Sequence, residues 1–234
     1  MQFFIFVLLI CFFIFLYCVY VLANDDFIFL RRDVTMEKIF NIIFLGSLIS
    51  LFVSRLFYGF FAKNIFANPL VFLLIPYFPG LSLLGGVVGA GAYLLFLRRR
   101  ENPLPTERMC DFFSIAFLIS LSVGFIGNFM FLEEGIGLIK AGVQAVLYFI
   151  LFIIFLKFFL PKLLNGKFKE GTIACLFLIC FSIVNLAINA FLKISILQYF
   201  KNFENIILIL IFFLSVGMLI WREDLLLEIK QSKK

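Results

Sequence analysis

Arg55 is the residue best suited to chemistry, because it interrupts an otherwise uncharged apolar run from residue 39 to 61. A guanidinium stays cationic and binds carboxylate or phosphate oxygens through paired hydrogen bonds. Glu133 and Glu134, at the end of another apolar run, are possible acidic partners. Ionised groups within apolar segments are costly and commonly mark functional sites. We therefore expect Arg55 to belong to an ion pair or an anion-binding site.

Several amide side chains also lie inside apolar runs. Gln144 lies in one run, and Asn185 and Asn189 lie in another, four residues apart and thus on one helix face. Taken singly, such amides are best explained as hydrogen bonds between helices. The chain has no histidine, so a mechanism that needs an imidazole base or ligand is excluded. No cysteine spacing is typical of a metal site or a disulfide framework.

The elements that carry these residues are predicted to be transmembrane helices. The 234-residue chain is 64% hydrophobic and 15% charged, with a mean hydropathy of +1.15, so its solvent must be lipid. A helix needs about 20 apolar residues to cross the hydrocarbon layer. Seven runs fit, and they predict an all-α integral membrane protein with one polytopic domain over 1–234; the runs are 3–23, 39–61, 81–97, 111–132, 138–160, 171–192 and 203–221.

Orientation follows from the basic residues of the loops. Fifteen of the 20 Lys and Arg residues fall on one side of the predicted spans and four on the other. The positive-inside rule then places the C-terminus in the cytoplasm and the N-terminus outside. The first run lacks a basic segment before it and is too long for a signal peptide, so we interpret it as a span. Residues 69–80, rich in proline, are interpreted as a re-entrant or interfacial segment.

This topology places polar groups of five helices at one depth, in the outer half of the membrane. Such a convergence predicts a polar pocket that opens toward the outer leaflet. Glycines at that depth have a simpler explanation, since Gly85 and Gly89 have the spacing that lets helices approach closely.

Five stretches resemble the bacterial prolipoprotein diacylglyceryl transferase family, in order, over roughly residues 40–193. The most specific is Gly124-Phe125-Ile126-Gly127-Asn128-Phe129 with Glu133 after it, which resembles the lipid-binding signature Gly-Arg-Ile-Gly-Asn-Phe…Glu of that family. The others are Ser54-Arg55-Leu56-Phe57-Tyr58, Ala67-Asn68-Pro69-Leu70, Leu81-Ser82-Leu83-Leu84-Gly85-Gly86 with Arg98-Arg99-Arg100, and Gly171 to Phe191.

The chain departs from the family pattern at residues that would be expected to carry charge. Phe125 stands where the signature has arginine, and Leu84 stands where the family has histidine. Asn185 and Asn189 occupy the positions of an arginine and a glutamate, and a His-Pro-Ser-Gln-Leu-Tyr-Glu motif is reduced to Gln144. Arg55, with Lys140 or Lys193 at helix ends, would have to supply the cationic groups.

The resemblance implies a multi-pass protein of the bacterial inner membrane that moves diacylglyceryl from phosphatidylglycerol to the lipobox cysteine of a preprolipoprotein. Two alternatives stay open: a catalytically silent lipid-binding relative, and a small lipid or solute transporter. No cofactor, metal or nucleic acid partner is expected, and no catalytic residue is assigned. The predicted lipid-binding residues are Arg55, Gly124, Gly127, Asn128, Glu133, Gln144 and Asn185.

Overall fold

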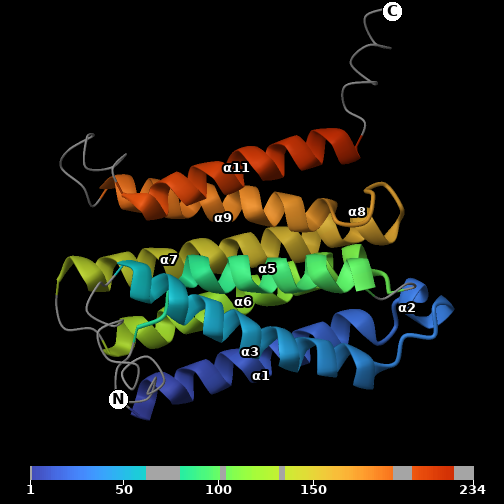
Figure 1. The fold of residues 1–234 in the computed structure, drawn as a ribbon, viewed down its shortest axis with the longest axis horizontal. Coiled ribbons are helices and arrows are strands. Elements are labelled where there is room, and N and C mark those ends of the chain that lie inside the picture. The colour runs from blue at the N-terminus through green and yellow to red at the C-terminus, as the bar shows by residue number, and fades with distance from the viewer. Residues whose placement is uncertain (1, 62–79, 101–103, 132–134, 192–201, 224–234) are drawn as a thin grey trace, which may run out of the picture. The chain divides into compact units, whose positions relative to one another are not determined.

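The computed structural model describes residues 2–61, 80–100, 104–131, 135–191 and 202–223. All regular elements within these ranges are helical (Figure 1). The helices are α1 (Gln2–Ala23), α2 (Phe27–Arg31), α3 (Met36–Phe61), α5 (Leu83–Arg100), α6 (Thr106–Phe131), α7 (Ile136–Ile154), the π-helical turn η1 (Phe155–Phe159), α8 (Leu160–Leu164), α9 (Thr172–Phe191) and α11 (Phe203–Arg222).

Six helical segments are long and apolar enough to cross a membrane, which confirms the all-α membrane class. They are α1, α3, α6, the continuous α7–η1–α8 segment, α9 and α11. The run at 81–97 forms α5, which has only fifteen residues before Arg98, or about 22 Å of apolar helix. That length is shorter than the hydrocarbon layer of about 30 Å, so α5 is helical but does not meet the same criterion.

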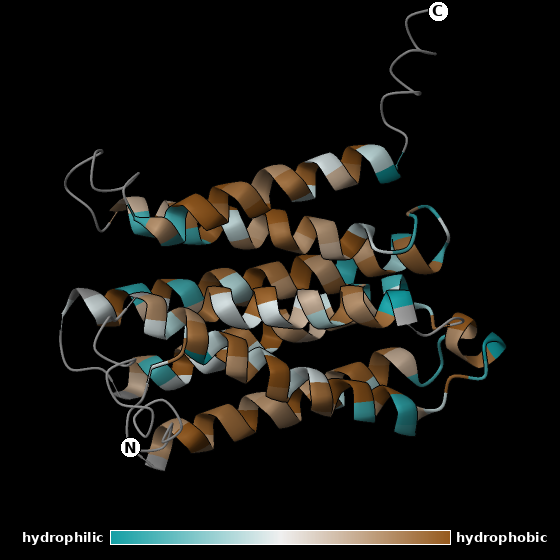
Figure 2. Ribbon diagram, in the orientation of Figure 1, coloured by the Kyte–Doolittle hydropathy of each residue, from teal (hydrophilic) through white to brown (hydrophobic). Residues whose placement is uncertain are grey.

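Hydrophobic residues make up most of these helices, as the brown colour of the ribbon shows (Figure 2). Phe13 is 64% exposed, Phe213 is 67% exposed and Met130 is 72% exposed. In water this surface would drive aggregation, whereas lipid tails solvate it. The exposure pattern therefore agrees with the composition in making lipid the surrounding solvent.

The chain divides into two compact units, Met1–Thr106 and Glu107–Lys234. In the first unit, α3 and α5 run antiparallel and side by side, and the end of α1 meets the beginning of α3 (Figure 1). In the second unit, α9 and α11 form a closely packed antiparallel pair. Whether the chain is one domain, as the sequence suggests, stays a prediction.

The segment from α7 to α8 is longer than its sequence pattern predicted, since it continues to Leu164 rather than ending at 160. Pro161 lies at the start of α8 and has no N–H to donate to the carbonyl of Lys157. The π-helical turn Phe155–Phe159 immediately before it relieves the clash of the proline ring with that carbonyl. The helix therefore passes the proline instead of stopping there.

Three of the sequence predictions fall outside the described residues. They concern the proline-rich segment up to residue 79, the acidic pair Glu133 and Glu134, and Lys193.

Candidate functional site

Arg55 lies in the first unit and is almost completely buried, at 1% exposure. Its Nη1 donates a hydrogen bond to the carbonyl oxygen of Gly80 at 2.6 Å, just before α5. Its guanidinium carbon lies 5.8 Å from the centre of the Tyr58 ring, one turn further along α3. A cation–π contact and a charged hydrogen bond both offset the cost of burying the charge. Arg55 thus connects α3 to the segment that leads into α5.

Serine hydroxyls fix the start of α5 beside Arg55. Ser54 Oγ donates to the carbonyl oxygen of Ser82 at 2.7 Å, and the Ser82 N–H donates back to the Ser54 carbonyl at 3.2 Å. Ser82 Oγ accepts from the Gly85 N–H at 3.2 Å and so caps the first turn of α5. One turn deeper, Ser50 Oγ donates to the Gly86 carbonyl at 2.8 Å. These bonds satisfy polar groups that lipid could not satisfy.

The glycines of α5 permit this close contact, as their spacing predicted. A Cβ at residue 85 would lie 2.6 Å from the Cβ of Phe57, and one at residue 89 would lie 2.8 Å from the Cβ of Val53. Such distances are too short for carbon atoms, so only glycine fits at these two positions. We call the contact formed by Ser50, Ser54, Ser82, Gly85 and Gly89 the glycine–serine seam.

The second unit contains a polar cluster around Tyr148, which the sequence analysis did not single out. Asn185 Nδ2 donates to the Tyr148 hydroxyl oxygen and to the carbonyl oxygen of Phe181, both at 2.8 Å. Gln144 Nε2 donates to Asn185 Oδ1 at 3.4 Å. Tyr148 is fully buried at 0% exposure and Gln144 is 4% exposed. The structure therefore brings together two of the predicted residues, Gln144 and Asn185, by hydrogen bonds between α7 and α9.

The glycine- and asparagine-containing signature lies in the last turns of α6. Phe125 stacks on Tyr148 with ring centres 5.7 Å apart and planes 5° from parallel. Phe129 lies over Gly142 of α7, where an added Cβ would meet its ring at 3.3 Å. The aromatic side of the signature thus packs against α7, while Asn128 is exposed. Gly127 is buried, Gly124 is half-buried, and Glu133 lies outside the described residues.

Phe125 and Asn185 have a further feature in common. They are the two positions where the family pattern has arginine, and both contact the same Tyr148 side chain. An aromatic stack and a neutral amide thus replace two cationic groups at one point of the second unit. Tyr148 could have been noticed in the sequence because it follows Gln144 by one helical turn.

A second amide pair joins α9 to α11. Asn189 Nδ2 donates to Asn205 Oδ1 at 2.9 Å, and both side chains are buried. The interpretation of the apolar-run amides as hydrogen bonds between helices is confirmed for Gln144, Asn185 and Asn189.

Charged residues at the start of α6 and at the end of α11 form a group beside the start of α9. The sequence analysis also missed this group. Asp111 accepts hydrogen bonds from the Gly171 N–H at 2.6 Å and the Ala174 N–H at 2.9 Å. Arg222 forms an ion pair with Glu107 at 2.5 Å. Glu223 accepts from the Thr172 hydroxyl and from the Lys169 N–H. We call Glu107, Asp111, Arg222 and Glu223 the charged clamp.

Part of the charged clamp could have been noticed in the sequence. Glu107 and Asp111 are four residues apart on one face of a helix, and both precede an apolar run. Arg222 directly follows the last apolar run and is one of the basic residues from which the topology is predicted. Nothing in one sequence pairs these distant positions, so the contact itself was not predictable.

Comparison with known proteins indicates the family to which this chain belongs. No curated protein and no solved structure matches the chain. The model of one protein family, described as prolipoprotein diacylglyceryl transferase, matches residues 2–221. That match spans nearly the whole chain and includes both units and every described helix that could cross a membrane, apart from the last residue of α11. The chain therefore belongs to the prolipoprotein diacylglyceryl transferase family.

Proposed function

We propose that this protein transfers a diacylglyceryl group from phosphatidylglycerol to the lipobox cysteine thiol of a preprolipoprotein. The observation that carries the proposal is the family match over residues 2–221, combined with six helices suited to a membrane. The proposal includes a place in the bacterial inner membrane, where phosphatidylglycerol and the signal-peptide region of the lipoprotein would meet.

The reaction sets requirements for the site. The cysteine sulfur bonds to the glyceryl carbon while the bond from that carbon to the phosphate oxygen breaks, and the thiol proton leaves with glycerol phosphate or to water. Negative charge develops on the leaving phosphate, which cationic and N–H groups stabilise. Arg55 is the guanidinium that we assign to this role, because it is the one arginine of the sequence within an apolar run.

We assign the lipid-binding role to the same residues that the sequence indicated: Arg55, Gly124, Gly127, Asn128, Glu133, Gln144 and Asn185. Two observations support parts of this set. Asn128 is exposed on α6 and could reach a lipid headgroup. Gln144 and Asn185 form a preorganised amide pair.

A second candidate function is a catalytically silent relative that binds phospholipid without transfer. The cluster around Tyr148 favours it, because Phe125 and Asn185 are neutral where the family pattern has arginines. Loss of one preorganised donor typically lowers a rate by about 10² to 10³. If other cations do not compensate, transfer would be slow while binding of the lipid persists.

One experiment separates the two candidates. The purified protein is reconstituted in vesicles with phosphatidylglycerol labelled in its acyl chains, and a lipobox peptide is added. Transfer predicts label on the peptide and one glycerol phosphate released per lipid consumed. The control peptide carries serine in place of the lipobox cysteine and should remain unlabelled.

The outcomes are distinct. An unlabelled cysteine peptide with phosphatidylglycerol still bound to the protein would identify the silent relative. A labelled peptide whose formation Arg55→Ala abolishes, with lipid binding intact, would assign the phosphate-stabilising role to Arg55. Absence of both transfer and binding would contradict the proposed function and its alternative together.

A further inference from the structure

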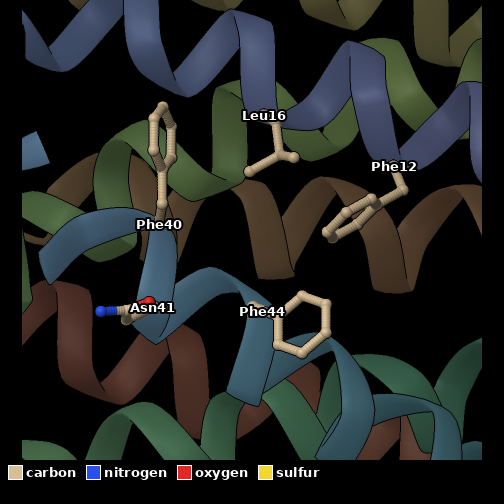
Figure 3. A pocket seen from close by; sticks show the side chains of 5 residues that line it. All are labelled: Phe12, Leu16, Phe40, Asn41 and Phe44. Atoms are coloured by element: carbon tan, nitrogen blue, oxygen red, sulfur yellow. The ribbon is translucent and has the colours of Figure 1, made fainter. Parts of the chain in front are cut away.

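A groove in the first unit lies between α1 and α3 (Figure 3). It has a volume of about 290 Å³, at the lower end of the range for ligand pockets. Four of its lining side chains are apolar and one is an amide; they are Phe12, Leu16, Phe40, Phe44 and Asn41. Both helices are candidate membrane spans, so the groove opens to lipid rather than to water.

The way in which α1 meets α3 creates this groove. The two helices touch near the end of α1 and the beginning of α3, where Tyr20 stacks on Phe40 with ring centres 6.4 Å apart. Val19 and Ala23 are buried there, each at 1% exposure. Toward the start of α1 the side chains become exposed, as Phe6 and Phe13 show. The groove therefore begins beside the Tyr20–Phe40 contact and extends into the hydrocarbon layer.

Asn41 gives the groove a polar end. Its side chain is exposed, and none of the residues that the structure describes hydrogen-bonds to its amide. An amide in a membrane-spanning helix needs a partner, because lipid tails offer none. Asn41 lies five residues after the start of α3, about 7.5 Å along the axis. That depth is close to the ester groups of phospholipids, whose carbonyl oxygens accept hydrogen bonds.

Glu37 adds charge at the mouth of the groove. It precedes Asn41 by four residues and so lies one turn closer to the helix end on the same face. Its side chain is exposed, and no described residue forms an ion pair with it. Lys38 is turned about 100° around the axis from Glu37, away from the face that carries Phe40, Asn41 and Phe44. Glu37 therefore places one carboxylate at the headgroup end of this face.

We propose that the groove binds a glycerophospholipid with an ammonium headgroup. One acyl chain lies among the four apolar side chains, Asn41 donates to its ester carbonyl, and the Glu37 carboxylate meets the ammonium group. This site would use the leaflet at the Lys38 end of α3, which the topology predicts to be cytoplasmic. It needs no residue of the proposed transfer site and selects a lipid of different charge from phosphatidylglycerol.

Native mass spectrometry of the full chain tests the proposal. The protein in micelles receives an equimolar mixture of phosphatidylethanolamine and phosphatidylglycerol with identical acyl chains, and the retained lipids are identified by mass. The lipid that the wild type retains beyond the amount retained by Leu16→Trp, which fills the groove and leaves the proposed transfer site unchanged, should contain phosphatidylethanolamine in about twofold to fivefold excess over phosphatidylglycerol, the range expected for an exposed ion pair. Glu37→Gln should remove this preference, while the matched control Asp33→Asn, which neutralises a nearby carboxylate off the groove face, should keep it.

Two further variants test the groove itself. Leu16→Trp fills it and should abolish the retention that belongs to the groove, whereas Phe13→Trp, on the exposed side of the same helix, should not. Asn41→Leu keeps the size of the side chain and should weaken retention of both lipids about twofold to tenfold. A melting curve and a single elution peak for each variant show that it is folded.

Several results would overturn the proposal. Equal amounts of the two lipids in the portion that Leu16→Trp loses would mean that Glu37 selects nothing. Equal retention by Leu16→Trp and Phe13→Trp would show only unspecific surface lipid. A dimer that Leu16→Trp alone disrupts would identify a second copy of the chain as the occupant.

Discussion

At the scale of single residues, the Tyr148 hydroxyl connects two helices that apolar contacts alone would leave free to slide. The hydroxyl oxygen accepts a hydrogen bond from Asn185 Nδ2, and Asn185 Oδ1 accepts one from Gln144 Nε2. Hydrogen bonds between membrane helices contribute about 0.6 kcal/mol on average and at most about 1.7 kcal/mol. The cluster sets the register of α7 against α9 more than it adds stability.

A double-mutant cycle measures this connection. Tyr148→Phe removes only the hydroxyl and Asn185→Leu removes the amide, and each should lower the free energy of unfolding in mixed micelles. The coupling between them should be about 0.6 to 1.7 kcal/mol. Tyr17→Phe, at a tyrosine that is 70% exposed, is the control and should change nothing. Strict additivity of the two changes would show that the hydroxyl and the amide do not interact.

Arg55 raises a different question, since it is buried in a structural contact and we also propose a ligand-binding role for it. Arg55→Ala loses the bond to the Gly80 carbonyl and should destabilise the protein by about 1.5 to 3 kcal/mol, the range for hydrogen bonds of charged groups. If Glu133 also pairs with Arg55, the change Glu133→Gln should recover part of that loss in the double variant. Thermal unfolding in detergent measures both, and independent effects would exclude the pair.

At the scale of helices, the sequence predicted where the elements lie and which ones approach closely. Each apolar run became a helix whose ends differ by a few residues, because a span must satisfy its own backbone wherever it meets lipid. The spacing of Gly85 and Gly89 correctly indicated a tight contact. The partner of that contact, α3, was not predictable, since Ser50 and Ser54 gave no sign of accepting or donating across helices.

The glycine–serine seam provides a prediction with an internal control. Gly85→Ala places a Cβ 2.9 Å from the Cα of Ser54, so α3 and α5 must separate. We expect a loss of about 1 to 3 kcal/mol, as for other overpacked contacts. Gly91→Ala on the same helix meets no atom within 4 Å and should be neutral or slightly stabilising. Equal melting temperatures of the two variants would contradict the seam.

The charged clamp provides a similar comparison in the second unit. Gly166 and Gly171 both have positive φ, +70° and +85°, so alanine strains either one by about 1 to 2 kcal/mol. At residue 171 the added Cβ would also collide with the Arg222 guanidinium, whereas at residue 166 it meets nothing within 4 Å. Gly171→Ala should therefore lower the unfolding free energy more than Gly166→Ala does. Equal losses would mean that Arg222 moves aside without cost.

At the scale of the whole molecule, composition alone determined the class, because only lipid can solvate a surface this apolar. Family membership could also be predicted from the sequence, since the signature in α6 keeps its glycines and asparagine in order. The contacts within the candidate site were harder to predict from the sequence. Replacement of arginine by Phe125 and Asn185 looked like a simple loss of charge, yet both side chains pack around Tyr148. A sequence shows which groups are missing but not what the remaining side chains do in their place.

Orientation in the membrane is the prediction on which every depth assignment depends. Fifteen basic residues on one side against four on the other place the C-terminus in the cytoplasm. A reporter fused after Lys234, or inserted after Asn165 between α8 and α9, should therefore be cytoplasmic. A reporter inserted after Gly135, between α6 and α7, should be outside. Gly135 and Asn165 are expected on opposite sides because the α7–η1–α8 segment separates them, whereas Asn165 and Lys234 are expected on the same side because both α9 and α11 lie between them. A periplasmic signal after Lys234 would invert the topology, moving Arg55 to the cytoplasmic half and the lipid groove of α1 and α3 to the outer leaflet.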